Sequence, residues 1–173
     1  SLLVEDGKKL ILIDCGLGNK QDDKFFGHYS LWGDDNLDNN LKKYGFVKED
    51  ITDVFLTHLH FDHCGGAIEW NDDKSGYRPA FKNAQFWTNE NHWQWATEPN
   101  AREKASFLKE NILPIQESGQ LNFLPLPSTG NYGFAPDLKM DVIFVDGHTE
   151  KQMLPVIQYQ EKTIVFAADL IPT

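Results

Sequence analysis

Residues 57–66, THLHFDHCGG, place three histidines and an aspartate within six positions, in a chain with six histidines in all. His58 and His60 are two residues apart, and side chains at i and i+2 of an extended segment point the same way. Two imidazoles held in this manner can share one metal ion, with metal–nitrogen bonds of about 2.0–2.1 Å. The alternative is chance clustering in a solvated loop, but the compact HxHxDH pattern favours a metal site.

The residues that follow predict a second cation beside the first. DHCGGA can begin a helix with Asp62 near its N-terminus, and this reversal would return Asp62 and His63 to the same cavity. Gly65 and Gly66 leave room for a tight backbone at the turn. Cys64 could bind zinc, but its place between His63 and two glycines indicates a packed thiol.

Two more candidate ligands follow other apolar segments. His148 lies in VDGHTE, after MDVIFV, and Asp169 lies in VFAADLIP. A catalytic zinc usually takes three protein ligands and keeps an open position, so the paired histidines need a further partner. Either residue alone would be interpreted as structural, but beside the motif at 57–66 both are candidate ligands. His28 and His92 lack such a context and are interpreted as surface or pocket-wall residues.

The elements that must position these residues are indicated by turn and cap signals. LLVEDGKKLILID predicts a hairpin with its turn at Asp6-Gly7, and the polar segment 16–36 predicts a loop. A helix is expected over 36–45, with an asparagine cap and Gly45 as its stop. A short buried strand at 51–57 then leads directly into the histidines.

The second half of the chain predicts one long helix followed by strands. EPNAREKASFLKENILPI, residues 98–115, is typical of a helix with a proline near its start. The strand-like segments lie at 119–126, 139–147, 152–160 and 162–170, and the last two predict a hairpin. Helices between groups of strands predict a layered α/β protein with helices packed outside the sheets.

The composition of the chain limits the classes of partner and the cellular compartment that can be expected. A net charge of −10 repels phosphate backbones, so nucleic acid is not an expected partner. No apolar run approaches the ~20 residues that span a bilayer, and no signal peptide is visible, so no membrane association is expected. Cys15 and Cys64 are too few for a disulfide framework, so reduced thiols and a cytoplasmic location are predicted.

THLHFDHCGG, DGHT and AADL, in this order and preceded by LILIDCG, resemble the metallo-β-lactamase superfamily over about residues 2–173. The resemblance implies a four-layer αββα sandwich of the α/β (α+β) class, with a dinuclear metal site at one edge. It implies these ligands: His58, His60 and His148 on the first metal, Asp62 and His63 on the second, and Asp169 bridging both. It also implies that Asp14 steadies the site without binding a metal.

The chain departs from the family pattern at both ends. The family's second metal normally takes another histidine beyond the bridging aspartate, and the chain stops at Thr173 without one. The family also usually has strands before the point where this chain begins. We therefore expect residues 1–173 to be one incomplete domain, truncated at both ends.

The resemblance implies metal-dependent hydrolysis, with a hydroxide shared by two zinc ions and Asp62 passing a proton to the leaving group. Manganese, iron or cobalt could take the place of zinc on histidine and aspartate ligands. The long tryptophan-rich segment before His148 resembles the branch of lactonases and organophosphate hydrolases. Four tryptophans could line an apolar pocket, or could equally pack a core or a homodimer contact: Trp70, Trp87, Trp93 and Trp95.

The predicted reaction is hydrolysis of an ester-type bond in a small molecule, with a lactone as the first choice. Phosphotriesters and glutathione thioesters are alternatives within the same family. A redox member with a di-iron site and a flavin partner domain would replace one histidine of the first motif, which is not observed. A non-catalytic metal-binding domain is the alternative from another class, and it would be expected to lose ligands.

Overall fold

The largest element of the fold is a five-stranded sheet, in a computed structural model that describes residues 1–5, 7–33, 36–128, 132–135 and 139–171. Its strand order is β1-β2-β3-β6-β7. The strands are β1 (Leu2–Glu5), β2 (Leu10–Ile13), β3 (Asp53–Phe55), β6 (Gln85–Asn89) and β7 (Leu121–Leu124). β1 and β2 form the antiparallel hairpin expected from the sequence, and β2, β3, β6 and β7 are parallel neighbours.

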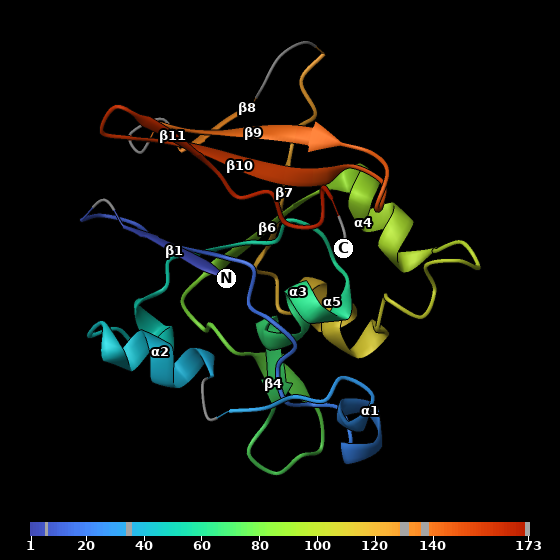
Figure 1. The fold of residues 1–173 in the computed structure, drawn as a ribbon. Helices are drawn as coiled ribbons and strands as arrows, with labels where there is room; N and C mark the ends of the chain where they lie inside the picture. The colour runs from blue at the N-terminus through green and yellow to red at the C-terminus, as the bar shows by residue number, and fades with distance from the viewer. Residues whose placement is uncertain (6, 34–35, 129–131, 136–138, 172–173) are drawn as a thin grey trace.

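A second, four-stranded sheet lies beside the first and is antiparallel throughout, in the order β11-β10-β9-β8 (Figure 1). Its strands are β8 (Tyr132–Ala135), β9 (Met140–Val145), β10 (Gln152–Tyr159) and β11 (Lys162–Val165). The hairpin predicted at its end is confirmed, and Gln160 in its turn has φ 54°. A small hairpin of β4 (Ile68–Trp70) and β5 (Tyr77–Pro79) stands apart from both sheets.

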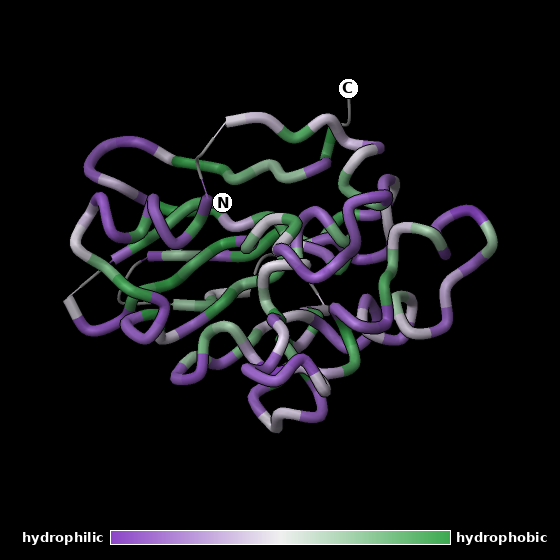
Figure 2. The backbone as a smooth tube through the Cα atoms, turned by 90° about the horizontal axis from the view of Figure 1, so that it is seen from below, coloured by the Kyte–Doolittle hydropathy of each residue, from purple (hydrophilic) through white to green (hydrophobic). Residues whose placement is uncertain are grey.

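Alternating side chains of the five-stranded sheet supply two cores. Leu10 and Leu12 face a core shared with the helices, while Ile11 and Ile13 face the other sheet. Between the sheets they meet residues such as Met153, all of them buried. A fully buried aliphatic side chain contributes about 1.5–3 kcal/mol, so both interfaces stabilise the sandwich. Figure 2 shows this pattern as apolar stretches that run through the sheets, with polar loops at the periphery.

Four of the five described helices contribute buried side chains to the core on the face of the five-stranded sheet that points away from the second sheet, as predicted, while the first has no buried residue. The five are α1 (Asp23–Gly27), α2 (Leu37–Lys43), α3 (Phe61–Cys64), α4 (Glu90–Thr97) and α5 (Lys109–Glu117), with 3-10 turns at Lys48–Asp50 and Gly65–Ala67. Within the described ranges no helix covers the outer face of the four-stranded sheet, so the fourth predicted layer is not among them. None of the described helices has the length and apolar character needed to cross a membrane.

Two predicted elements differ from the structure. The loop expected at 16–36 contains α1, whose first turn is capped by the Asp22 side chain. The helix expected at 98–115 is wrong over residues 98–108, which are not helical and form turns at 101–106, and α5 begins only at Lys109. There the Asn100 side chain accepts hydrogen bonds from the backbone N–H groups of Arg102 and Glu103, and this local bonding competes with a helical ladder.

The direction of the strands decides where the functional residues gather. β2, β3 and β6 are parallel, so the residues that follow them meet at one edge of the sheet. β9 and β11 are both antiparallel to β10, so their last residues also lie at a common edge. The predicted ligands follow three of these strands, β3, β9 and β11, and Asp14 follows β2.

Candidate metal centre

The segment after β3 carries His58, whose ring is oriented by its neighbour Thr57. The Thr57 hydroxyl donates to Asp14 Oδ2 at 2.8 Å, so its oxygen must accept from His58 Nδ1, 3.1 Å away. This bond places the ring proton on Nδ1 and leaves Nε2 without one. Nε2 is buried and has no hydrogen-bond partner among the described residues. A free imidazole lone pair in a buried position is suited to a metal ligand.

Asp14 holds the opposite side of the site together. It lies after β2 with φ 54°, a left-handed conformation that aspartate adopts more readily than most residues. Its Oδ1 accepts from the Thr57 N–H and its Oδ2 accepts from His63 Nδ1, both at 2.8 Å. Burial lowers the pKa of His63, but the bond and charge of Asp14 outweigh it and leave that pKa above its usual value. The ring is fixed with Nε2 facing the centre of the site.

His148 and Asp169 approach from the four-stranded sheet. His148 Nε2 lies 3.0 Å from His60 Nδ1. Asp169 Oδ2 lies 3.2 Å from His148 Nε2 and 3.9 Å from His58 Nε2, while its Oδ1 lies 3.4 Å from His63 Nε2. The two oxygens of one carboxylate therefore face different histidines, Oδ2 facing His58 and His148 and Oδ1 facing His63.

These contacts define two groups of ligand atoms that share one residue. His58, His60 and His148 form the first group, and His58, His63 and Asp169 form the second, with the atoms of each group within 4.8 Å of one another. Burial first, and neighbouring histidines second, lower the pKa of His58 well below its usual value and that of His60 to about 4. The neutral rings keep the lone pairs that a metal requires, so the residues present fit a bound cation.

Asp62 lies outside both groups. Its side chain is 47% exposed, and its Oδ2 is 3.6 Å from His63 Nε2. It lies in the first turn of α3, one residue after the helix begins at Phe61. Its role as a ligand therefore stays a prediction, while its exposure leaves it free to reach a bound molecule.

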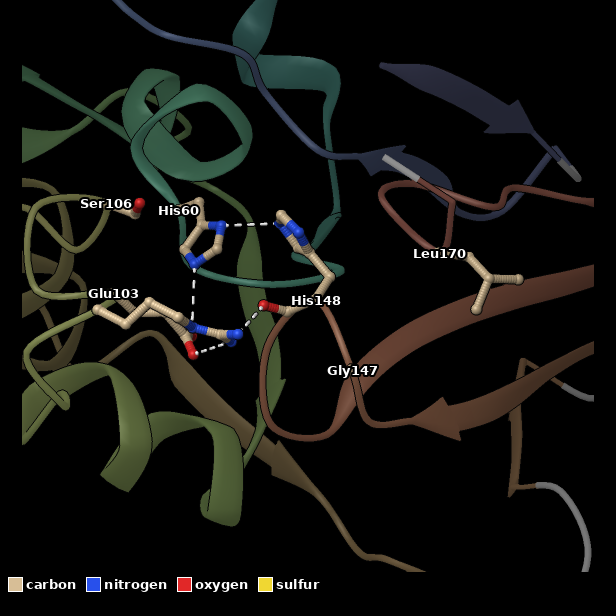
Figure 3. A pocket seen from close by; sticks show the side chains of 7 residues that line it. His60, Glu103, Ser106, Gly147, His148 and Leu170 are labelled. Carbon is tan, nitrogen blue, oxygen red and sulfur yellow. Dashed lines mark hydrogen bonds and ion pairs between the residues drawn. The ribbon is translucent and has the colours of Figure 1, made fainter. Parts of the chain in front are cut away.

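A cavity of about 560 Å³ opens beside the first group of ligand atoms. Its lining comes from four parts of the chain (Figure 3): His60, Arg102, Glu103, Ser106, Gly147, His148 and Leu170. A volume of this size is within the range of small-molecule sites. The residues from 102–106 carry no recognisable motif, and sequence reasoning missed them because the composition of 98–115 predicts a helix without functional residues.

Glu103 is the buried charge of this cavity. Burial alone would raise its pKa, but hydrogen bonds from Arg102, Trp95 and Thr149 outweigh that effect and lower the pKa to about 2. Its Oε2 lies 3.8 Å from His60 Nε2. The carboxylate thus stays ionised beside a candidate ligand.

The four tryptophans do not line this cavity. Trp93, in α4, is buried in the core between the helices and the five-stranded sheet. Trp87 packs against Phe134 between the two sheets. Trp70 stacks on a tyrosine of the small hairpin, with ring centroids 4.4 Å apart. Trp95 touches the site only indirectly, because its Nε1 donates to Glu103. Their positions therefore agree with packing, the alternative to a pocket lining that the sequence left open for these tryptophans.

Two other sequence interpretations can be compared with the structure. Cys64 is a buried free thiol that donates to Leu59 O, as predicted for a packed cysteine. His28 is exposed, but His92 is neither a surface nor a pocket-wall residue. It is fully buried behind the metal centre, where it bonds two backbone groups.

The sequence profile described as the metallo-beta-lactamase superfamily matches residues 1–173. The chain belongs to this superfamily. An N-acyl homoserine lactonase from Bacillus cereus is 25% identical over 173 residues, covering 94% of this chain and 59% of the relative. This chain therefore spans about three fifths of the length of the Bacillus cereus lactonase.

Solved structures of the superfamily share the fold. A probable metal-dependent hydrolase from Staphylococcus aureus aligns with a TM-score of 0.83 at 23% identity, covering 98% of this chain and 57% of that one. AidC, described as a dizinc quorum-quenching lactonase in complex with a product, aligns with a TM-score of 0.71 at 24% identity, covering 98% and 55%. At these identities the likeness establishes the metallo-β-lactamase fold alone.

Proposed function

We propose that this chain belongs to a metal-dependent hydrolase that opens the lactone ring of N-acyl homoserine lactones. The observation that carries the proposal is the pair of ligand groups that share His58 beside an open cavity. The Bacillus cereus relative, which carries the name N-acyl homoserine lactonase, supports this choice of substrate. The non-catalytic alternative is disfavoured because all five residues of the two groups are retained.

Zinc is the proposed metal, with one ion held by His58, His60 and His148 and a second by His63 and Asp169, because the one free nitrogen of His58 can bind only one ion. Two zinc ions would lower the pKa of a water molecule toward neutrality and polarise the carbonyl that it attacks. Histidine and carboxylate ligands also accept manganese, iron or cobalt, so the identity of the metal is to be determined by elemental analysis of the isolated protein.

The protein's own side chains supply binding and proton transfer. Asp62 is exposed next to His63, so it can take up a proton and return it to the alkoxide that leaves as the ring opens. Arg102 is 70% exposed on its side chain and reaches both Glu103 and the His148 carbonyl, which places a donor at the cavity rim. That donor can bind the amide or carbonyl oxygen of a neutral substrate.

An aromatic cluster continues from the metal motif and offers an apolar surface. Phe61 lies between His60 and Asp62 in the sequence, and its ring contacts those of Phe25 and Tyr29 at centroid distances of 5.3 and 5.1 Å. These rings are partly exposed. We assign the acyl chain to this surface rather than to the four tryptophans.

The remaining assignments follow from the same proposal. Both cores share the five-stranded sheet, which supports treating residues 1–173 as one domain. The partner is a small molecule, and a net charge of −10 argues against nucleic acid. Cytoplasmic location and a homodimer contact stay predictions from the sequence.

The test compares substrates on the isolated protein with its metal content measured. N-hexanoyl and N-decanoyl homoserine lactones, an aryl phosphotriester and a glutathione thioester are offered at equal concentration. We expect lactone opening, detected as acid release and as a mass gain of one water, to be fastest. Chelation should abolish it and added zinc should restore it.

Two outcomes would contradict the proposal. Faster turnover of the phosphotriester or the thioester would reassign the substrate class while keeping the metal centre. Absence of chelator-sensitive turnover on all four substrates, in protein that contains zinc, would favour a binding domain.

A further inference from the structure

His92 is a buried histidine that is not one of the candidate ligands. It lies in the first turn of α4, with a side chain that has no solvent exposure. The Leu59 N–H donates to its Nε2 at 2.9 Å, and its Nδ1 lies 2.6 Å from the Glu150 carbonyl oxygen. Both ring nitrogens are therefore bonded to backbone groups of other segments.

The two backbone groups belong to the two loops that carry the first group of ligands. Leu59 lies between His58 and His60, and Glu150 lies two residues beyond His148. One rigid ring thus spans from the loop after β3 to the loop after β9. The two loops follow strands of different sheets, so no hydrogen bonds between paired strands set the distance between them.

The chemistry of the partners fixes the state of the ring. A backbone N–H can only donate, so Nε2 of His92 must lack a proton and accept from Leu59. A carbonyl oxygen can only accept, so Nδ1 must carry the proton and donate to Glu150. Only the neutral ring protonated at Nδ1 makes both bonds.

We propose that His92 is a positioning residue for the metal centre, whose ring sets the separation between the His58–His60 loop and the His148 loop. It contacts no metal in this role and acts through the backbone of Leu59 and Glu150. The proposal rests on the metal centre assigned above, but it does not depend on which substrate is cleaved.

Neighbouring contacts show why His92 differs from an ordinary core residue. The Met153 N–H donates to Thr57 O at 2.8 Å, which joins the two sheets one residue before the first ligand. The Asn89 side chain donates to Lys151 O at 2.9 Å and anchors only the His148 side. Of these three contacts, only that of His92 reaches the backbone between His58 and His60.

The test uses two variants that each keep half of the bridge. In H92Q the side-chain oxygen can still accept near the position of Nε2, and in H92N the amide can still donate near that of Nδ1. T97V is the matched control, because the Thr97 hydroxyl bonds only within α4, to the carbonyls of Trp93 and Gln94. Zinc dissociation constants are measured by chelator competition, and cobalt absorption spectra report the ligand geometry.

We expect zinc binding to weaken about 10–100-fold in H92Q and H92N, which is the usual effect of losing a group that orients a ligand. The cobalt spectra of both variants should shift, while T97V should bind zinc within about twofold of the unaltered protein. Zinc affinities and cobalt spectra equal to those of T97V would overturn the proposal and leave His92 as a core residue.

A measurement on the unaltered protein covers the case in which neither variant folds. Nitrogen-15 NMR of the imidazole rings should find Nδ1 of His92 protonated and Nε2 unprotonated. A proton on Nε2 would overturn the proposal, since the bond from Leu59 could not then form. Absence of zinc binding by the unaltered protein would overturn the proposed function as well, whereas unchanged affinity in the variants overturns this inference alone.

Discussion

Asp14 and His63 form the smallest functional unit of the site. The carboxylate of Asp14 accepts from three donors, two of Thr57 and one of His63. In D14N one oxygen becomes an amide that cannot accept, so the His63 ring loses its fixed orientation. We expect zinc affinity at the His63–Asp169 group to fall about 10–100-fold, measured by chelator competition.

D53N is the control for that variant. Asp53 is also a buried carboxylate in the five-stranded sheet, and it accepts from Thr52, Trp87 and Lys9. Those three partners are not candidate ligands, so D53N should lose stability while zinc affinity stays within about twofold. Equal losses of zinc in D14N and D53N would contradict the role given to Asp14.

The thiol of Cys64 gives a second prediction at the residue scale. Burial raises its pKa to about 12, and burial also raises the pKa of Cys15 well above its usual value. Only the thiolate reacts with alkylating agents, so a higher pKa means less reactive sulfur at any given pH. We expect no iodoacetamide labelling of the native protein from pH 7 to 9, and labelling of both cysteines in denaturant. Rapid native labelling at pH 8 would contradict this.

At the residue scale, the candidate ligands can be predicted from the sequence, but the residues that surround and orient them cannot. His58, His60 and His63 are recognisable because one short segment carries them all. Glu103 and His92 show no pattern, since their importance comes from backbone and side-chain groups far away in the chain. Metal binding by the assembled residues stays a prediction.

At the scale of elements, α3 and the turn after it pack backbone to backbone against the segment that follows β2. A Cβ on Gly65 would lie 2.0 Å from Leu17 O, and one on Gly66 would lie 2.2 Å from Cys15 O. We expect G65A to lower the free energy of unfolding by at least about 3 kcal/mol, because the obstructing atom belongs to the backbone. Urea denaturation in the presence of a chelator measures the folding effect separately from metal binding.

Gly27 is the matched site for this comparison. It lies at the end of α1, and a Cβ there would meet nothing within 4 Å. G27A should therefore change stability by no more than about 1 kcal/mol in either direction. A G65A variant as stable as G27A would contradict this prediction, because it would show that the turn after α3 and the segment after β2 can move apart without loss of free energy of unfolding.

The elements that the sequence predicts well are those with strong local signals. The first hairpin and α2 have clear turn and cap residues, and Asn36 caps α2 as expected. The helix expected at 98–115 has helical composition, but the structure uses 101–106 as a turn whose Ser106 carbonyl accepts from Phe61. That bond to the metal motif is a tertiary contact, which composition does not encode.

At the scale of the whole molecule, the ligands come from both sheets. His58 and His60 follow the five-stranded sheet, and His148 and Asp169 follow the four-stranded sheet. A cation bound by these residues would join the sheets, and binding to the folded state alone adds about 2.7–4.1 kcal/mol at 100–1,000 times the dissociation constant. We therefore expect zinc to raise Tm by about 5–15 °C over chelator-treated protein.

Hydrogen exchange locates that stabilisation. Amides of β9, β10 and β11 should exchange more slowly with zinc, because opening the second sheet would break the ligand set. A rise in Tm without slower exchange in these strands would mean that zinc binds elsewhere. No change in either quantity would contradict a metal site that spans the sheets.

The separation of the ligands along the chain also has a consequence for biosynthesis. The HxHxDH motif leaves the ribosome well before His148 and Asp169, which follow only with the strands of the second sheet. A nascent chain therefore exposes an unfinished set of histidines while most of its C-terminal sheet is still to be synthesised. Loading of the proposed metal centre would therefore be a late event, and cellular metals that bind two histidines strongly could occupy the motif before the remaining ligands arrive.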